Sequence, residues 1–507
     1  MIDTSVENEA AITRFPTGIA GLDTILQGGF MRGDIYILQG SPGAGKTILS
    51  NQICFNHAAN GGRALYVSLL AENHARVIRN LRGMAFFNEA AIPDRILYLS
   101  SFSELRDGGL PAMVTLLRRE IRSQKASLLV IDGMVTAQTI APDTQAFKEF
   151  IHTLQEVALI SDCTMILTTT ESSGEASPER TMVDGLIEMV DRPYGWDTSR
   201  DLRVTKFRGS DFLGGRHSYA ICDSGVVVYP RLESLYAYPS RPDTAAEGVL
   251  NTGIDKLDAM LGGGLPIAST TMVTGPSGIG KTTLGLHFLT GSSSDEPGLM
   301  FGFYETPARL QVKADRMSPP LRELIANGVV ELIWHTPTGD LLDAYGQQLL
   351  EAVDRRSVKR LFIDGLTAFQ NGAIDPDRIG NFFAALANEL RVRGVTTVYS
   401  LEVPDILGPA PRVPVDDASS LAENMILLRF VEQRSRLHRL VSVLKVRDSD
   451  FDPTLYEFRL TNSGMEIENS SDGAEAILSD PVHPNPRAGR SPGGADASAR
   501  STPTSEG

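Results

Sequence analysis

Short apolar runs of strand length alternate with amphipathic stretches over most of the chain. Apolar and β-branched residues in consecutive positions favour buried strands, whereas apolar residues that recur about every 3.6 positions favour helices. The predicted strands include GDIYILQG (33–40), ALYVSL (64–69), SLLVID (127–132) and CTMILTTT (163–170), and the predicted helices include KTILSNQICFNHAAN (46–60) and PAMVTLLRREIRSQ (111–124). This alternation predicts an α/β fold with a mostly parallel sheet and helices on both faces.

The whole pattern occurs twice along the chain. For example, GSPGAGKT (40–47) is repeated as GPSGIGKT (275–282), 235 residues later. The other matched blocks, first copy then second, are 17–30 and 252–265, 127–137 and 359–369, and 204–212 and 443–451. Four blocks in the same order and at nearly constant spacing indicate a duplication. We therefore expect two tandem domains, at residues 13–237 and 248–468.

Composition changes at two places outside these predicted domains. The stretch YPSRPDTAAEG (238–248) is rich in proline and small residues, and we interpret it as the linker between the copies. From residue 470 to 507 the chain is rich in Pro, Gly, Ser and Ala and contains few aromatic residues. Such a composition cannot bury enough apolar surface to offset the entropy of ordering, so we predict a disordered C-terminal tail that is available to partner proteins.

Both GxxxxGK[ST] motifs lie between a predicted strand and a predicted helix, which is the context of a phosphate-binding loop. Glycines allow consecutive backbone N–H groups to surround phosphate oxygens at a helix N-terminus. Lys46 and Lys281 are expected to reach the β- and γ-phosphates of ATP. The residues predicted to bind nucleotide are Gly40, Ser41, Pro42, Gly43, Ala44, Gly45, Lys46, Thr47, Gly275, Pro276, Ser277, Gly278, Ile279, Gly280, Lys281 and Thr282.

Each copy also has an aspartate at the end of an apolar strand. Asp132 and Asp364 occupy this place, where an isolated aspartate would more often be a cap or turn residue. Together with the threonines of the loops, Thr47 and Thr282, they are predicted to hold Mg²⁺ and its water. Both copies are therefore expected to bind ATP with Mg²⁺.

Net charge, hydropathy and cysteine content limit the partners and the cellular compartment that we expect. A net charge of −15 argues against nucleic acid, and the short basic clusters at 356–360 and 429–439 are read as solvated edges. No apolar stretch is long enough to span a membrane, and the N-terminus has no features of a secretory signal. Three widely spaced cysteines suggest no disulfide framework, which favours a reducing cytoplasm.

With these motifs, the chain resembles the KaiC family, the double-domain RecA-like ATPases of the circadian clock and their relatives. The resemblance covers residues 13–468 and rests on TGIxxLD, both phosphate loops, both Asp strands and the terminal KxRGS and KxRDS elements. It implies two tandem RecA-like P-loop NTPase domains, a homohexameric ring and nucleotides at the subunit interfaces.

The resemblance also implies that a Lys-x-Arg element of the neighbouring subunit senses the γ-phosphate. The matching residues are Lys206, Arg208, Lys445 and Arg447. A cation supplied in trans would stabilise charge on the transferred phosphoryl group, as an arginine finger does. Without the repeat, these residues would be interpreted as exposed strand charges. Asp448 stands where the first copy has Gly209, and this carboxylate could weaken the field of Arg447.

KaiC relatives carry two adjacent glutamates after the strand that follows the phosphate loop. In the second copy Tyr304 and Glu305 occupy these positions, so Glu305 is the candidate general base. In the first copy Leu70 and Ala71 occupy them, and Glu72 lies two residues beyond the first. Residues two apart on a strand share a face but are about 6–7 Å apart, so Glu72 reaches the site only if the chain bends. The first site is expected to hydrolyse ATP slowly or not at all.

A last match concerns phosphorylation. The second domain of KaiC autophosphorylates adjacent Ser and Thr residues before an apolar strand, and Ser419 and Ser420 occupy these positions here. Serines at such places are also common as helix caps.

Three functions follow as hypotheses. The leading one is a KaiC-like ATPase ring with serine autokinase activity in signalling or timing. The alternatives are a nucleotide-gated scaffold with little turnover, and a RecA-like ATPase of DNA recombination or repair, which the acidic charge disfavours.

Overall fold

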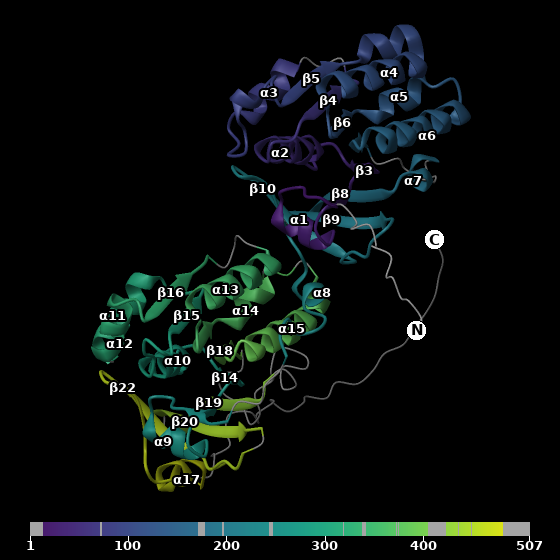
Figure 1. Ribbon diagram of the computed structural model, residues 1–507. Helices are drawn as coiled ribbons and strands as arrows, with labels where there is room; N and C mark the ends of the chain where they lie inside the picture. The colour runs from purple at the N-terminus through teal and green to yellow at the C-terminus, as the bar shows by residue number, and fades with distance from the viewer. Residues whose placement is uncertain are drawn as a thin grey trace, which may run out of the picture.

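The computed structural model consists of two α/β halves that lie one beyond the other along the molecule (Figure 1). It describes residues 14–70, 74–170, 178–194, 197–242, 247–317, 319–336, 341–371, 373, 375–403, 422–433, 436–447 and 449–479. Each half is built around one nine-stranded sheet, and a separate two-stranded pair precedes it in the chain. The predicted pair of RecA-like domains is therefore confirmed at the level of the fold.

In the first half, the sheet order is β5-β4-β6-β7-β3-β8-β9-β10-β11. Its strands are β3 (Ile35–Gly40), β4 (Ala64–Ser68), β5 (Ile96–Ser100), β6 (Leu128–Asp132), β7 (Thr164–Thr169), β8 (Gly185–Tyr194), β9 (Asp197–Phe207), β10 (Arg216–Cys222) and β11 (Gly225–Tyr229). The helices are α1 (Ala20–Ile25), α2 (Lys46–Ala59), α3 (His74–Leu81), α4 (Phe102–Gln124), α5 (Met134–Ile140), α6 (Thr144–Ser161) and α7 (Pro178–Met182), with a 3₁₀ turn η1 (Glu89–Ala91) and the pair β1 (Arg14–Phe15) and β2 (Phe30–Met31).

The second half has the same topology, with the order β16-β15-β17-β18-β14-β19-β20-β21-β22. Its strands are β14 (Thr270–Gly275), β15 (Gly298–Gly302), β16 (Val330–Trp334), β17 (Arg360–Asp364), β18 (Thr396–Glu402), β19 (Asn424–Gln433), β20 (Arg436–Lys445), β21 (Tyr456–Thr461) and β22 (Gly464–Ile467), preceded by the pair β12 (Val249–Leu250) and β13 (Leu265–Pro266). The helices are α9 (Asp255–Met260), α10 (Lys281–Thr290), α11 (Pro307–Met317), α12 (Pro319–Ala326), α13 (Leu342–Arg356), α14 (Leu366–Asn371), η2 (Pro376–Arg378), α15 (Ile379–Val392) and α17 (Asp472–Ser479).

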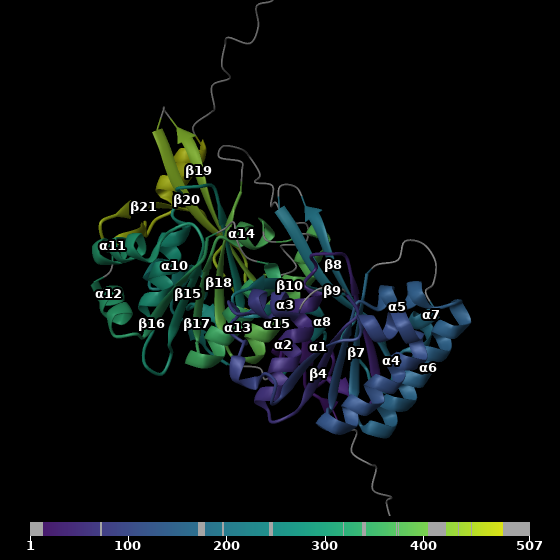
Figure 2. The same ribbon diagram turned by 90° about the horizontal axis from the view of Figure 1, so that it is seen from above.

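Six strands of each sheet are parallel, and an antiparallel extension of three strands completes it. In the first half β8 pairs parallel with β3, and β9, β10 and β11 then continue antiparallel. The long pairs β8–β9 and β19–β20 project from their sheets (Figure 2). The sequence predicted the parallel part from its strand–helix alternation, and the extension adds hairpin connections that this alternation does not contain.

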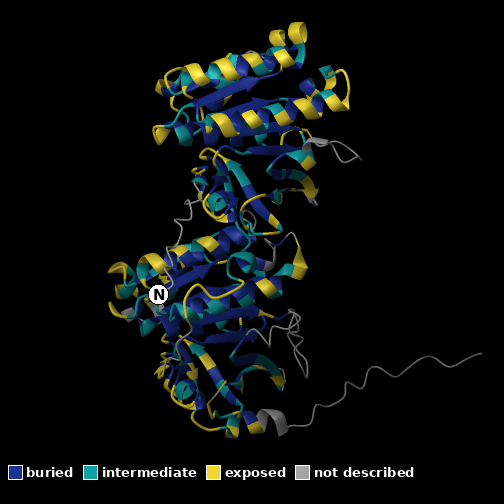
Figure 3. Cartoon of the chain, turned by 45° about the vertical axis from the view of Figure 1, so that its right-hand side comes forward, coloured by how far each residue is buried: buried dark blue, intermediate teal, exposed yellow. Residues whose placement is uncertain are grey.

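The parallel strands are buried on both faces because alternate side chains enter two different cores. Along β6, Leu128 and Val130 join one hydrophobic cluster, whereas Leu129 and Ile131 join the other. Figure 3 shows the strands as buried and the outer faces of the helices as exposed. This distribution explains why the predicted strands are continuous apolar runs and not alternating ones.

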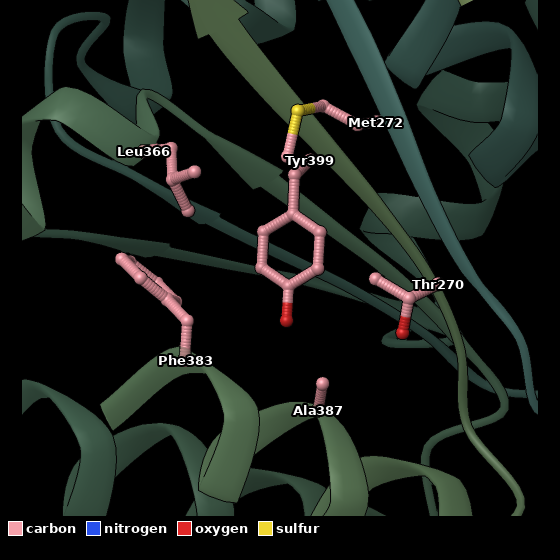
Figure 4. A pocket seen from close by; sticks show the side chains of 6 residues that line it. All are labelled: Thr270, Met272, Leu366, Phe383, Ala387 and Tyr399. Carbon is pink, nitrogen blue, oxygen red and sulfur yellow. The ribbon is translucent and has the colours of Figure 1, made fainter. Parts of the chain in front are cut away.

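In the second half, α15 packs on one face of the sheet. Phe383 and Ala387 of this helix face Tyr399 of β18 and Thr270 of β14 around a small cavity of about 10 Å³ (Figure 4). The Tyr399 hydroxyl points into this space and, within the described part of the chain, has no hydrogen-bond partner.

The segment that joins the halves is anchored on the second half. Helix α8 (Leu232–Leu235) lies beside α13 and α15. The backbone N–H of Leu232 donates to Asp343 over 3.2 Å, and Ser240 donates from both its N–H and its hydroxyl to Glu389, each over 2.7 Å.

The prediction of disorder from residue 470 onward is wrong for residues 472–479. These residues form α17, which buries Ala474 against Leu440 of β20. The burial of Ala474 gives this segment an apolar contact that its mostly polar composition did not indicate. Residues 480–507 lie outside the described residues.

Candidate functional site

The second phosphate loop follows the central strand β14 at its carboxyl end, where ligands bind in open α/β sheets. Gly280 has a φ of 126° at the point where the loop enters α10, a conformation that side chains rarely adopt. The Lys281 ammonium donates to the carbonyl oxygens of Gly275 and Pro276, each over 2.8 Å. Burial lowers the pKa of Lys281, although the carboxylates of Glu402 and Asp364 oppose this shift.

Asp364 ends β17 beside this loop and accepts two side-chain hydrogen bonds. Thr282 donates to one carboxylate oxygen over 2.8 Å, and Ser400 of β18 donates to the other over 2.6 Å. Mg²⁺ is commonly held by one or two protein oxygens together with water and substrate phosphates. The convergence of the Thr282 hydroxyl and a buried carboxylate at the loop fits this donor set.

A cavity of about 530 Å³ opens between this loop and the neighbouring strand ends. Its lining includes the loop residues, Tyr304, Glu305, Lys313, Asp364 and Glu402. Glu305 is half-buried and forms an ion pair with Lys313 of α11. The candidate base and the candidate metal carboxylate thus border the same cavity as the loop.

The first phosphate loop has the same backbone arrangement. Gly45 has a φ of 92°, and Lys46 donates to the carbonyls of Gly40 and Ser41 over 2.6 and 2.9 Å. Burial lowers the pKa of Lys46, with an opposing effect from Asp132.

Asp132 differs from Asp364 in its partners. Thr168 of β7 donates to one oxygen of Asp132, and the buried Tyr66 of β4 donates to the other over 2.7 Å. Among the described residues, Thr47 makes no hydrogen bond to Asp132, in contrast to the bond between Thr282 and Asp364.

The two halves also differ at the position just before the candidate base. Ser68 is aligned with Asp132 and Gly302 with Asp364, so Leu70 and Tyr304 are equivalent. Accordingly, Leu70 lies against Gly133 as Tyr304 lies against Gly365. Leu70 has no proton acceptor, and Ala71 and Glu72 lie outside the described residues.

The Lys-x-Arg elements lie at the amino-terminal ends of the parallel strands, whereas the phosphate loop of the same half lies at their carboxyl ends. Lys206 pairs with Leu186 near the start of β8, whereas the loop follows the carboxyl end of β3. Lys445 likewise pairs with Met425 at the start of β19. Because β3 and β8 run parallel, Lys206 lies near the start of β3 and not near the phosphate loop at the end of β3.

Within the chain these cations bind carbonyl groups and carboxylates. Lys206 donates to the carbonyl of Thr181 over 2.8 Å, and Arg208 lies 3.6 Å from Asp184. Lys445 donates to the carbonyl of Ala422 over 2.9 Å, and Arg447 lies 3.8 Å from Glu423. Burial lowers the pKa of Lys206.

The remaining candidates fall outside the described residues. They are Ser419, Ser420 and Asp448.

The sequence interpretation missed four residues that contact the candidate carboxylates: Tyr66, Thr168, Ser400 and Lys313. The repeat contained a signal for two of them. Thr168 and Ser400 are separated by the same 232 residues as Asp132 and Asp364, and each aligns with its aspartate across parallel strands. The sequence contained no signal for Tyr66, because a tyrosine within an apolar run is interpreted as a residue of the hydrophobic core.

Two P-loop domains of RecA-like topology in tandem define the class of this protein. The family model described as "ATPase: KaiC" matches residues 15–233 and 250–472, and the chain belongs to this family. Similar proteins named "Circadian clock oscillator protein KaiC" occur in Parathermosynechococcus lividus and Nostoc sp., each 24% identical over 92% of this chain and over 88% and 91% of their own lengths. The protein of that name in Synechococcus elongatus is 23% identical over 92% of each chain.

No helix in the described ranges is long and apolar enough to cross a membrane.

Proposed function

We propose that both halves bind ATP with Mg²⁺, that the second half hydrolyses it, and that the first half mainly binds nucleotide and supports assembly. At the second loop, Glu305 would act as the general base for water, Asp364 and Thr282 would hold the metal, and Lys281 would bind the phosphates. The observation that carries this division is the cavity of about 530 Å³ in which Glu305, three positions after Gly302, borders the second loop, whereas the residue three positions after Ser68 in the first half is Ala71, which has no proton acceptor.

The bound metal would neutralise charge on the β- and γ-phosphates and orient them. The residues of this chain would do the rest. The loop amides and Lys281 would fix the phosphates, and the Glu305 carboxylate would accept the proton of the attacking water. The base must approach that water to about 3 Å, and its ion pair with Lys313 competes with this contact.

We also propose that Lys206 and Arg208, and Lys445 and Arg447, act on nucleotide bound to a neighbouring subunit of a ring. Support comes from their position at the ends of the strands opposite to their own phosphate loop, which points away from contact with nucleotide bound in the same subunit. A ring of copies, with six as the expectation from the family, would place each element against the next loop. The domains would extend over 13–237 and 248–468.

Phosphorylation of Ser419 or Ser420 is proposed as a second activity of the same nucleotide site. The transfer would move the γ-phosphoryl group of ATP to a serine oxygen, release ADP and pass the hydroxyl proton to a base such as Glu305. With the relatives named as circadian clock oscillator proteins, we propose a role in signalling or timing.

Phosphate release by the wild type, Lys46→Ala and Lys281→Ala tests the division of labour, with oligomer size measured by sedimentation. We expect Lys281→Ala to remove most turnover and Lys46→Ala mainly to loosen the oligomer. A loss of turnover confined to Lys46→Ala would refute this assignment. Absence of both phosphate release and labelling of the two serines would favour the nucleotide-gated scaffold, and stimulation by DNA would favour the recombination ATPase.

A further inference from the structure

Tyr66 stands next to the candidate metal carboxylate of the first site. It lies on β4 opposite Val130 of β6, so Asp132, two residues further along β6, shares its face of the sheet. The Tyr66 side chain is fully buried, and its ring packs against Tyr98 with centroids 5.2 Å apart. Its hydroxyl therefore has a fixed direction, and it donates to Asp132 over 2.7 Å.

The second half provides an internal comparison for this contact. Met300 of β15 lies opposite Phe362, two residues before Asp364, and is therefore the equivalent of Tyr66. A methionine side chain cannot donate a hydrogen bond. In both halves one carboxylate oxygen accepts from an equivalent hydroxyl, that of Thr168 or Ser400. The other oxygen accepts from Tyr66 in the first half, but from Thr282 of the phosphate loop in the second.

We propose that Tyr66 is a positioning residue that holds Asp132 away from the metal position, so that nucleotide binding at the first loop depends only weakly on Mg²⁺. This inference rests on the proposed function in one respect, that the first loop binds nucleotide, and it restricts the role proposed for Mg²⁺ to a minor one at that loop. A carboxylate oxygen that accepts a buried phenol hydrogen bond has less capacity to accept from a metal-bound water or from Thr47. The first site then relies on its loop amides and Lys46, which suits retention of nucleotide more than its turnover.

Neither the sheet nor the phosphate loop requires a tyrosine at this place. The second half has the same strand register with Met300, and its aspartate contacts the loop threonine. The hydroxyl of Tyr66 is thus a difference between the two carboxylate environments that a single substitution can remove. Its removal leaves the ring in place, so Tyr66→Phe separates the hydrogen bond from the packing.

The test is the affinity of a fluorescent ATP analogue for the full chain in Mg²⁺ and in EDTA. Lys281→Ala serves as the parent, so that binding reports on the first loop. We expect Tyr66→Phe to raise the ratio of the dissociation constants, EDTA over Mg²⁺, by about tenfold, because a hydrogen bond to a charged group is removed from the competing partner. Tyr98→Phe is the matched control, since the Tyr98 hydroxyl donates to Asn51 and not to Asp132; its ratio should equal that of the parent.

The reciprocal variant is Met300→Tyr in a Lys46→Ala parent, which should lower the same ratio at the second loop. An unchanged ratio in Tyr66→Phe, with ATP still bound, would overturn the inference. If the Lys281→Ala parent binds no nucleotide with or without Mg²⁺, the proposed function of the first site is wrong. In that case Met300→Tyr tests the inference at the second loop. An unchanged ratio of dissociation constants in Met300→Tyr would then overturn the proposed effect of a tyrosine beside the carboxylate.

Discussion

Lys313 is joined to Glu305 by an ion pair at the edge of the second phosphate-loop cavity. The two residues are eight positions apart: Glu305 lies in the short connection after β15, and Lys313 comes from α11, which follows that connection. The pair holds the candidate base at the cavity but occupies its carboxylate. Lys313 is therefore in a position to restrain hydrolysis.

We expect Lys313→Ala to raise the rate of phosphate release severalfold at saturating ATP with Mg²⁺, because the carboxylate becomes free to contact water. Glu305→Gln should reduce the rate by about a hundredfold or more, the usual contribution of a general base. Arg309→Ala is the control, because Arg309 is an exposed cation on the same helix that does not line the cavity. A higher KM without a higher kcat in Lys313→Ala would instead identify Lys313 as a phosphate ligand.

Arg378 secures the segment between the halves. It donates to Glu233 of α8 over 2.7 and 2.9 Å and to the buried Asp343 over 2.9 Å. Arg378→Ala leaves these carboxylates without their cation, and we expect a loss of about 3–5 kcal/mol in the free energy of unfolding. Cleavage of the segment 236–247 by a protease should also become faster.

Arg241→Ala is the matched control for Arg378, because Arg241 pairs with Asp354 over 3.3 Å at an exposed place on the same segment. Exposed pairs contribute little, so neither unfolding nor cleavage should change noticeably. Equal effects of the two substitutions would contradict the anchoring role of Arg378.

His217 makes the first half sensitive to acid. Its Nδ1 accepts from the N–H of Arg231 and its Nε2 donates to the carbonyl of Leu213, an arrangement that requires the neutral ring. Burial is the main cause that lowers its pKa from 6.5 to about 4. Because the unfolded state takes up the proton first, the stabilising effect is complete above pH 6.5 and is lost as the pH falls to about 4.

The loss over this window should reach about 3 kcal/mol. The free energy of unfolding is measured by denaturant at several pH values for the wild type and for His217→Gln. The contribution of His217 is the difference between the two profiles, because burial also lowers the pKa of His57 to about 4 and His57 therefore contributes over the same pH range. His152→Gln, at an exposed site, should leave the profile unchanged. A profile of His217→Gln parallel to that of the wild type would contradict the assignment.

The hydroxyl of Tyr399 faces the cavity beside Phe383 and Ala387 without a partner among the described residues (Figure 4). An unpaired buried hydroxyl is unfavourable, so Tyr399→Phe should raise the free energy of unfolding of the second half by about 1 kcal/mol. Tyr345→Phe is the contrasting variant, because the Tyr345 hydroxyl donates to the carbonyl of Thr336 over 3.0 Å, and its loss should destabilise. A destabilised Tyr399→Phe would mean that the hydroxyl is satisfied in solution. Fluorescence of Trp334 can follow the unfolding of this half.

The repeated patterns determined most of the architecture. The apolar runs at 64–69 and 127–132 became β4 (Ala64–Ser68) and β6 (Leu128–Asp132) almost without change. Both phosphate loops lie between strand and helix as their motifs predicted, because glycine conformation and helix initiation are local properties. Even the predicted helix at 111–124 is explained locally, since Gly109 interrupts α4 just before Pro111.

The sequence by itself therefore determined the duplication, the two phosphate loops and the strands that end in Asp132 and Asp364. Only the tertiary structure decided which side chains share each carboxylate. The contact of Tyr66 joins two strands and depends on strand order. The contact of Lys313 joins a loop residue to the following helix and depends on how that helix is placed. A tyrosine in an apolar run packs as core in either case, and the direction of its hydroxyl toward Asp132 follows only from the pairing of β4 with β6.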